Sequence, residues 1–597
     1  MDTQSEAAGA KARQTAEEMV RLAAQSQRVV SDFLAHQAAE HHIGAADPLS
    51  IGKAFFEMTS KMMANPAALV EAQMSLWQSY MDLWQRAAQS MLGGQPAEPL
   101  VAPAPDDRRF KDPEWSENQV FDFIKQSYLL TARWLQSTVR QVEGLDDKTA
   151  QKVDFYTRQF IDAMAPTNFA LTNPTVLRET VESHGENLLR GLKNLLGDLE
   201  RGEGKLAISM TDQSAFELGK NVAVTPGKVV FQNELIQLIQ YEPLTEKVHQ
   251  YPLLIIPPWI NKYYVLDLQP KNSFVRYAAS CGYTTFVVSW VNPDDRLSHK
   301  SFEDYMLEGT YAALDAVLKA TGEKQALAVG YCLGGTLLAS TLAHMAAKGD
   351  TRIKAATFLA TLVDFKEPGD LGVFIDEEQL KALEARMSKK GYLEGRDMAT
   401  TFNMLRSNDL IWSFVVNNYL LGKDPFPFDL LYWNSDSTRM PAEMHRFYLR
   451  KMYQENKLSE PGGITLAGVP IDLTKVDVPT YVLATREDHI APWASTFEAT
   501  KLYNGPVRFV LSGSGHIAGV VNPPEAKKYG HWTGPLSRGM SAEAWLAGAA
   551  PHEGSWWTDW DAFLAKHGGK KVPARKPGDR GLKVIEDAPG SYAKIRA

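Results

Sequence analysis

The sequence predicts an α/β protein built on a mostly parallel sheet, and three observations indicate it. From Val222 onward, short apolar runs rich in β-branched residues recur along the chain. A helix-like segment at 302–321 separates the runs at 284–289 and 326–329. At 597 residues, the chain is long enough for a large core and at least one accessory region. Strands that alternate with helices are typical of a parallel sheet covered by helices on both faces.

Eight runs are expected to form strands of this sheet. In chain order they are 229–231, 236–241, 253–256, 284–289, 326–329, 355–359, 480–484 and 507–511. They divide the sheet region into a first part at 222–363 and a second part at 476–597, which also carries the C-terminal segment. The roughly hundred residues between them, 364–475, exceed any usual connection and are rich in aromatic residues and Met. We interpret them as an inserted cap subdomain.

Helices are expected before the sheet region. Residues 1–92 form a helical N-terminal region in which Met74, Trp77, Met81 and Trp84 recur at helical spacing. Residues 93–112 are rich in Pro and Ala and indicate a linker. Residues 113–221 show helical periodicity again and are expected to support the sheet domain that follows.

Composition excludes several classes of function. A net charge of -8 provides no broad basic surface, so nucleic acid is not an expected partner. No apolar run approaches the roughly 20 residues of a transmembrane span, and the polar N-terminus lacks a secretory signal, so we expect a cytoplasmic protein. The chain has two cysteines, Cys281 and Cys332, which excludes a disulfide framework and a cysteine-rich zinc site. We expect neither a metal nor a cofactor.

A nucleophile motif follows the run at 326–329. Gly330-Tyr331-Cys332-Leu333-Gly334-Gly335 is a G-x-C-x-G pattern between a strand and a helix-forming run, 336–347. This is the nucleophile elbow of the α/β-hydrolase fold with Cys in place of Ser. The following helix N-terminus favours a thiolate and directs the Leu333 N–H toward a developing oxyanion. Cys281 has no such context and is predicted to be structural.

The partners of the thiol are expected on later loops, in the order acid and then histidine. His516 follows the last predicted strand in a Gly-Ser-Gly turn and is the predicted base. Asp488, on the loop after 480–484, is favoured as the acid over Glu487, and His489 is expected to pack within that loop.

The second oxyanion N–H is expected after the strand 253–256, in the segment Pro257-Pro258-Trp259-Ile260. Either Trp259 or Ile260 fits this role, and we take Ile260 as the candidate.

Six segments together resemble class I polyhydroxyalkanoate synthases. They are PPWINKYYVLDLQP, GYCLGGT, YWNSDSTRMP, TREDHIAPW, SGSGHIAGVVNPP and EDAPGSYAKIR. The resemblance implies that Cys332 is the nucleophile, His516 the base and Asp488 its partner. It implies an (R)-3-hydroxyacyl coenzyme A substrate, chiefly 3-hydroxybutyryl, a growing polyester product, and coenzyme A present only as part of the thioester.

The resemblance also implies partners and a place in the cell. These are a homodimer, association with polyester granules in the cytoplasm, and contact with granule coat proteins such as phasins. Two alternatives stay open: a cysteine hydrolase of the dienelactone or thioesterase type, and a non-enzymatic granule protein. Candidates for coenzyme A phosphate contacts are Lys262, Arg439 and Arg450.

Overall fold

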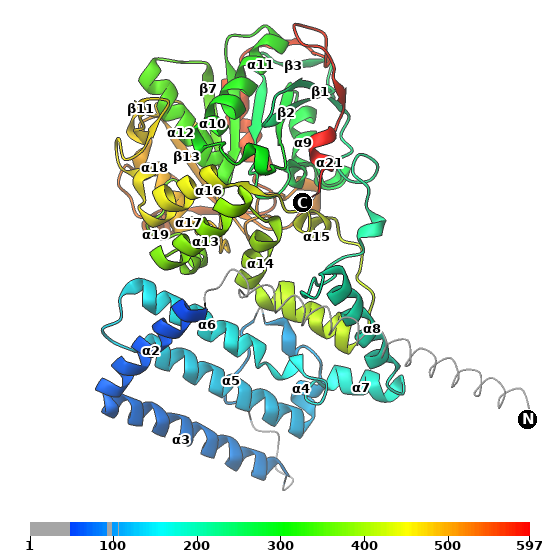
Figure 1. Cartoon of the computed structure of the whole chain (residues 1–597), viewed down its shortest axis with the longest axis vertical. Helices are drawn as coiled ribbons and strands as arrows, with labels where there is room; N and C mark the ends of the chain where they lie inside the picture. The colour runs from blue at the N-terminus through cyan, green and yellow to red at the C-terminus, as the bar shows by residue number, and fades with distance from the viewer. Residues whose placement is uncertain (1–47, 92–97, 106, 597) are drawn as a thin grey trace, which may run out of the picture. The chain divides into compact units, whose positions relative to one another are not determined.

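The computed structural model describes residues 48–91, 98–105 and 107–596 (Figure 1). The chain divides into two compact units. One, the helical unit, comprises 1–212 with 402–426, and the other, the sheet unit, comprises 213–401 with 427–597. The predicted helical region before residue 48, and residues 93–97 and 106 of the predicted linker, lie outside the described residues.

The described helical unit is built from amphipathic α-helices with polar caps. Asn118, Asp146 and Asn173 accept hydrogen bonds from backbone N–H groups in the first turns of α5, α6 and α7, which fixes where these helices begin. Its helices include α2 (Pro48–Ala64), α3 (Pro66–Met91), α4 (Glu114–Glu117), α5 (Gln119–Arg140), α6 (Asp147–Ala163), α7 (Pro174–Glu182) and α8 (Glu186–Arg201).

Residues 402–426 come from the predicted insertion but belong to the helical unit. Helix α8 explains this placement, because Gly191 allows the backbone of Tyr419 to approach so closely that a Cβ would lie 1.8 Å from its carbonyl oxygen. Tyr419 also donates a hydrogen bond of 2.6 Å to Asp198 on the same helix. The segment 364–475 therefore contributes to both units.

Helix α3 keeps its predicted apolar stripe at the surface. Met74, Trp77, Met81 and Trp84 are each between 51% and 67% exposed. An exposed apolar stripe of this kind is typical of an interaction surface rather than of a core. No helix within the described ranges is long and apolar enough to cross a membrane.

The sheet unit contains an 11-stranded sheet whose centre is parallel. The strand order is β15-β14-β13-β12-β7-β6-β4-β5-β2-β1-β17, and the strands from β5 to β13 in this order pair in parallel. Antiparallel strands complete both edges. The strands are β1 (Gly227–Gln232), β2 (Ile236–Tyr241), β4 (Leu253–Ile256), β5 (Thr285–Trp290), β6 (Ala326–Tyr331), β7 (Ile353–Leu359), β12 (Thr480–Thr485), β13 (Val507–Ser512), β14 (His531–Thr533), β15 (Ala550–His552) and β17 (Glu586–Asp587).

Each predicted strand overlaps a strand of this sheet, and the predicted α/β class is confirmed. Three two-stranded ribbons accompany the sheet: β3 (Lys247–His249) with β16 (Lys571–Pro573), β8 (Tyr392–Leu393) with β9 (Met440–Pro441), and β10 (Thr465–Leu466) with β11 (Val469–Pro470).

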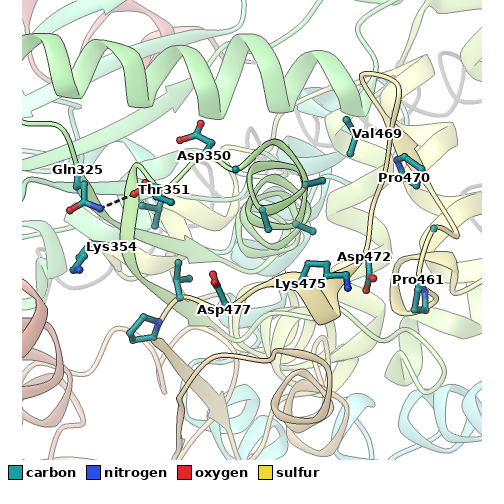
Figure 2. A pocket seen from close by; sticks show the side chains of 18 residues that line it. Gln325, Asp350, Thr351, Lys354, Pro461, Val469, Pro470, Asp472, Lys475 and Asp477 are labelled. Carbon is teal, nitrogen blue, oxygen red and sulfur yellow. Dashed lines mark hydrogen bonds between the residues drawn. The ribbon is translucent and has the colours of Figure 1, made fainter.

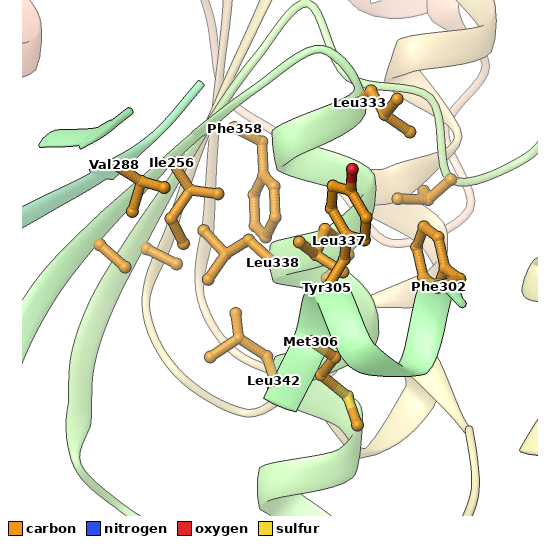
Figure 3. Packing of buried hydrophobic residues seen from close by; sticks show 14 of the residues in the cluster. Ile256, Val288, Phe302, Tyr305, Met306, Leu333, Leu337, Leu338, Leu342 and Phe358 are labelled. Atoms are coloured by element: carbon orange, nitrogen blue, oxygen red, sulfur yellow. The ribbon is translucent and has the colours of Figure 1, made fainter. Parts of the chain in front are cut away.

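Both faces of the sheet are buried, so successive strand residues enter two different cores. Leu254 and Ile256 of β4 pack into the first core, whereas Leu253 and Ile255 pack into the second. Figure 3 shows the first core, where Leu337, Leu338 and Leu342 of α12 meet Ile256, Val288 and Phe358 of the sheet.

The helices of the sheet unit include those that cover these two faces and those of the insertion. They are α9 (Phe274–Ser280), α10 (Phe302–Asp304), α11 (Ala312–Thr321), α12 (Leu333–Lys348), α13 (Glu377–Lys390), α15 (Asp429–Asn434), α16 (Ala442–Phe447), α17 (Trp493–Phe497), α18 (Ala499–Leu502), α19 (Ala542–Gly548), α20 (Trp557–His567) and α21 (Ser591–Lys594). Helix α14 (Gly395–Leu405) spans the division at residue 402.

Trp560 of α20 joins the second core to the centre of the sheet. Its side chain is fully buried, its ring lies 4.7 Å from that of Phe274, and its Nε1 donates a hydrogen bond of 3.0 Å to Thr357 Oγ1 on β7. The residue thus contributes both apolar burial and a satisfied polar contact.

We predict that Trp560→Ala lowers the free energy of unfolding of the sheet unit by about 3–5 kcal/mol, because it opens a large cavity. Trp560→Phe, which keeps a ring but loses the N–H donor, should cost roughly 1–2 kcal/mol. Urea unfolding followed by circular dichroism measures both. Equal unfolding midpoints for the two variants would contradict this account of the core.

Candidate active site

Cys332 lies at a strained turn between β6 and α12. Its backbone has φ 50° and ψ −122°, a left-handed conformation that is unfavourable for a residue with a side chain. The Cys332 N–H donates to Leu359 O at 2.9 Å, and its carbonyl accepts from Gly335 N at 2.9 Å. The turn therefore holds the thiol at the carboxyl end of the central strand, where the sequence motif predicts it.

Glycines make this turn possible. A Cβ on Gly334 would lie 2.2 Å from Ile256 O, and one on Gly335 would lie 2.0 Å from Thr361 Oγ1. A Cβ on Gly330 would lie 2.5 Å from the Cα of Gly335. The first turn of α12 therefore lies so close to β4 and to the end of β7 that a residue with a side chain would not fit at these glycine positions.

His516 and Asp488 form a buried pair beside this turn. His516 Nδ1 lies 2.7 Å from Asp488 Oδ2, and the two side chains are 6% and 0% exposed. Asp488 also accepts hydrogen bonds from Thr485 Oγ1 and from the backbone N–H groups of Ile490 and Ala491. Tyr331, directly before Cys332, stacks on the His516 ring and donates to its carbonyl oxygen at 3.0 Å.

The electrostatics of the pair favour an imidazolium facing a carboxylate. Burial alone lowers the pKa of His516, but the Asp488 carboxylate and then Cys332 outweigh it and raise that pKa to about 10. Burial alone would raise the pKa of Asp488, yet the charge and hydrogen bond of His516 hold it below its ordinary value. The arrangement is suited to holding a proton on the ring next to the thiol.

The other acid, histidine and cysteine that the sequence offered do not join the His516–Asp488 pair. Glu487 is exposed on the loop after β12 and takes no part in the His516 contact. His489 is half-buried in the same loop. Burial, and then the Asp561 carboxylate, raise the pKa of the Cys281 thiol to about 12, which disfavours a reactive thiolate there.

Three backbone N–H groups are candidates for the oxyanion site: those of Trp259 and Ile260 in the loop after β4, and that of Leu333 at the start of α12. Leu333 is the first residue of α12, so its N–H precedes the helical hydrogen-bond ladder. Within the described part of the chain, the N–H groups of Leu333, Ile260 and Trp259 donate to no other protein group. Ile260 is half-buried, whereas the Trp259 ring is buried against Trp290 and Tyr305. These N–H groups are available for an oxyanion.

The sequence analysis assigned no role to three aromatic residues that lie near the thiol. Phe365, Tyr448 and Tyr453 form an aromatic cluster with ring centroids 4.9–6.0 Å apart. Burial, and then the neighbouring phenol and Cys332, raise the pKa of Tyr448. All three residues come from the predicted insertion, and only its aromatic richness pointed to them.

The proposed phosphate-binding cations are differently placed. Lys262 is 2% exposed and lies 2.7 Å from Asp436 Oδ1, so it is not free to meet a phosphate in this structure. Arg450 makes a forked contact with Glu384, and Arg439 lies over the ring of Tyr392.

A cavity of about 910 Å³ lies at the amino ends of the central strands β6, β7 and β12 (Figure 2). Gln325 and Pro479, which line it, directly precede β6 and β12, and Thr351 lies two residues before β7. Cys332 directly follows the other end of β6. This cavity is therefore separate from the thiol and its partners.

Comparisons with known proteins found two matching family models and several similar curated proteins. A family model described as the N-terminus of poly-beta-hydroxybutyrate polymerase matches 106–278, and one described as the alpha/beta hydrolase fold matches 251–523. The chain is 52% identical to a poly(3-hydroxyalkanoate) polymerase of Methylorubrum extorquens over 93% of this chain and 91% of the relative. It is 50% identical to a poly(3-hydroxyalkanoate) polymerase subunit of Rhizobium meliloti, over 97% of this chain and 94% of the relative. It is 44% identical to the corresponding subunit of Cupriavidus necator, over 89% of each chain.

The raised pKa of His516 predicts how stability depends on pH. The folded-state pKa of about 10 lies above the unfolded value of about 6.5. The contribution of protonated His516 to the free energy of unfolding is therefore fully present below pH 6.5 and is lost as pH rises through 10. The difference in free energy of unfolding between the protein and His516→Gln should therefore be largest near pH 6 and shrink toward pH 10.

Asp488→Asn should flatten the same slope, because it removes the carboxylate that favours the imidazolium. Denaturant titrations at several pH values measure both effects. Parallel curves for the protein and both variants would show that the pair does not hold a proton as described.

Proposed function

We propose, because the chain belongs to the family of poly(3-hydroxyalkanoate) polymerases, that it joins (R)-3-hydroxyacyl groups into polyester and releases coenzyme A. Short acyl chains, chiefly 3-hydroxybutyryl, are the proposed substrates, as in class I members of the family. The observation that carries the mechanism is the 2.7 Å contact between His516 Nδ1 and Asp488, on a ring whose pKa the neighbouring Cys332 also raises.

In the loading step, the Cys332 thiolate attacks the thioester carbonyl of the substrate. The bond between the acyl carbon and the coenzyme A sulfur breaks, and His516 gives its proton to the departing thiolate. Leu333 and Ile260 N–H donate to the oxyanion of the tetrahedral intermediate. One thioester replaces another, so the acyl group on Cys332 stays activated.

In the elongation step, the 3-hydroxyl group of another unit attacks the acyl-Cys332 carbonyl. His516 accepts the hydroxyl proton, and Asp488 stabilises the resulting imidazolium. The thiolate leaves, and an oxoester forms in place of a less stable thioester. This step drives chain growth. The proposed mechanism uses only Cys332, His516 and Asp488, and coenzyme A enters only as part of the thioester substrate.

Water must be kept from the acyl-enzyme, since hydrolysis would end the chain. The aromatic cluster of Phe365, Tyr448 and Tyr453 supports this requirement, because the buried rings of Phe365 and Tyr448 belong to the core against which Cys332 and the half-buried Tyr453 pack. An apolar cover of this kind favours transfer to a bound hydroxyl over transfer to bulk water.

The proposal includes an assembly. We propose a homodimer that acts in the cytoplasm at the surface of polyester granules, in contact with coat proteins such as phasins. The exposed apolar stripe of α3 supports an interaction surface on the helical unit, and Trp77 and Trp84 are its most exposed members.

We predict that Cys332→Ala lowers coenzyme A release from 3-hydroxybutyryl coenzyme A by about 10⁴-fold or more, because the covalent step is lost. Cys281→Ser should retain activity, since that thiol lies outside the elbow. A thiol-specific dye measures coenzyme A, and centrifugation recovers insoluble polymer. Release of free acid without polymer would instead identify a hydrolase, and turnover by Cys332→Ala would refute the assigned nucleophile.

Asp488→Asn should load Cys332 but elongate about 10²- to 10⁴-fold more slowly, because an aliphatic hydroxyl needs a strongly supported base. Acyl-enzyme or short oligomers should then accumulate, and mass spectrometry of the intact protein detects them. The matched variant Glu487→Gln should elongate almost normally, since that side chain is exposed. A stall in Glu487→Gln but not in Asp488→Asn would show that the acid is misassigned.

A further inference from the structure

The loop that carries Ile260 is held by a segment of the insertion, residues 433–438. Thr438 N donates to Ile260 O at 3.0 Å, and Asn261 forms an antiparallel bridge with Ser437. Trp433 Nε1 donates to Lys262 O at 2.7 Å. These contacts tie three consecutive residues of the loop, 260–262, to one short stretch of the insertion.

The Thr438 hydroxyl acts on the peptide group that carries the candidate oxyanion donor. Its Oγ1 donates a hydrogen bond to Trp259 O, and it lies 3.0 Å from Ile260 O. In a planar trans peptide, the carbonyl of residue 259 and the N–H of residue 260 belong to one rigid plane and point in opposite directions. Fixing the carbonyl from one side therefore fixes the direction of the Ile260 N–H on the other side.

A buried ion pair also joins the loop 260–262 to the segment 433–438. The side chains of Lys262 and Asp436 are 2% and 1% exposed, and Lys262 Nζ lies 2.7 Å from Asp436 Oδ1. Neither atom has a further hydrogen-bond partner among the described residues. Tyr264 Oη donates to Asp436 Oδ2 at 2.8 Å. Each charge is buried with its counterion, so removing either side chain would leave the other charge buried without compensation.

We propose that Thr438 and the Lys262–Asp436 ion pair are positioning residues that direct the Ile260 N–H toward the oxyanion. They touch neither the substrate nor the reacting atoms and act through the backbone of 259–262. The inference rests on the proposed function, in which Ile260 is an oxyanion donor. It makes the insertion part of the catalytic apparatus, because the second donor is directed only while 433–438 is docked.

The first test compares Thr438→Val, which keeps the shape but loses the hydroxyl, with Thr438→Ser, which keeps the hydroxyl. Both are made in the Cys281→Ser background, so that Cys332 is the only thiol. Acylation by 3-hydroxybutyryl coenzyme A should have a kcat about 10- to 100-fold lower in Thr438→Val with little change in KM, by comparison with loss of an oxyanion donor. Thr438→Ser should stay within about threefold of the parent.

Alkylation of Cys332 by iodoacetamide separates positioning from general damage, because this displacement forms no oxyanion. Its rate should be unchanged in Thr438→Val. A matching loss of alkylation would show that the thiol itself was disturbed and would overturn the inference. Equal acylation kinetics in the parent and Thr438→Val would also overturn it, while leaving the proposed function intact.

The ion pair is tested with Asp436→Asn and with the double variant Lys262→Met/Asp436→Leu. The double variant removes both buried charges and should recover the thermal unfolding midpoint lost in Asp436→Asn, yet keep a lowered kcat for acylation. Recovery of both properties would show a purely structural pair and overturn its positioning role. If the parent protein itself releases no coenzyme A, the proposed function fails and the inference falls with it.

Discussion

The close approach of α12 to the centre of the sheet is the constraint on which the site depends. Gly330, Gly334 and Gly335 let the first turn of α12 touch β4 and the end of β7, and this contact holds Cys332 at positive φ. A residue in this conformation costs of order 1–3 kcal/mol, so the surrounding core must enforce it. Leu333, Leu337 and Leu338 are fully or almost fully buried in that core, and they anchor the helix that carries the strain.

The later strands deliver the partners of the thiol to the same edge of the sheet. β12 and β13 are parallel neighbours in register, with Thr485 beside Ser512, so their following loops emerge side by side. Asp488 and His516 therefore meet although 28 residues separate them in the chain. Trp556 and Trp557 donate to the carbonyls of Gly519 and Val520 and hold the loop after His516 from the other core. Packing, rather than local sequence, sets the distance between acid and base.

The sequence predicted the structure best where a short segment determines it by its own residues. The central strands were predictable because both faces are buried and their runs are continuously apolar, and the glycines around Cys332 identified the elbow. The edge strands β14, β15 and β17 were not predicted, because segments of two or three residues such as Ala550–His552 carry no apolar pattern. The assignment of 402–426 to the helical unit depends on distant contacts such as Gly191 with Tyr419, which no local pattern encodes.

Buried ion pairs explain why the roles of Lys262 and Asp436 were also out of reach. A lysine in a loop beside a predicted active site suggests a phosphate contact, yet burial lowers the pKa of Lys262, and only the adjacent Asp436 opposes that effect. Replacing a buried ion pair by apolar residues is often neutral or stabilising, so stability alone does not account for this one. An apolar contact, unlike a hydrogen-bonded ion pair, does not fix the orientation of the groups that it joins. A carboxylate that meets both Lys262 Nζ and Tyr264 Oη admits one register between the loop and the insertion, and this register is what an oxyanion donor on the same loop requires.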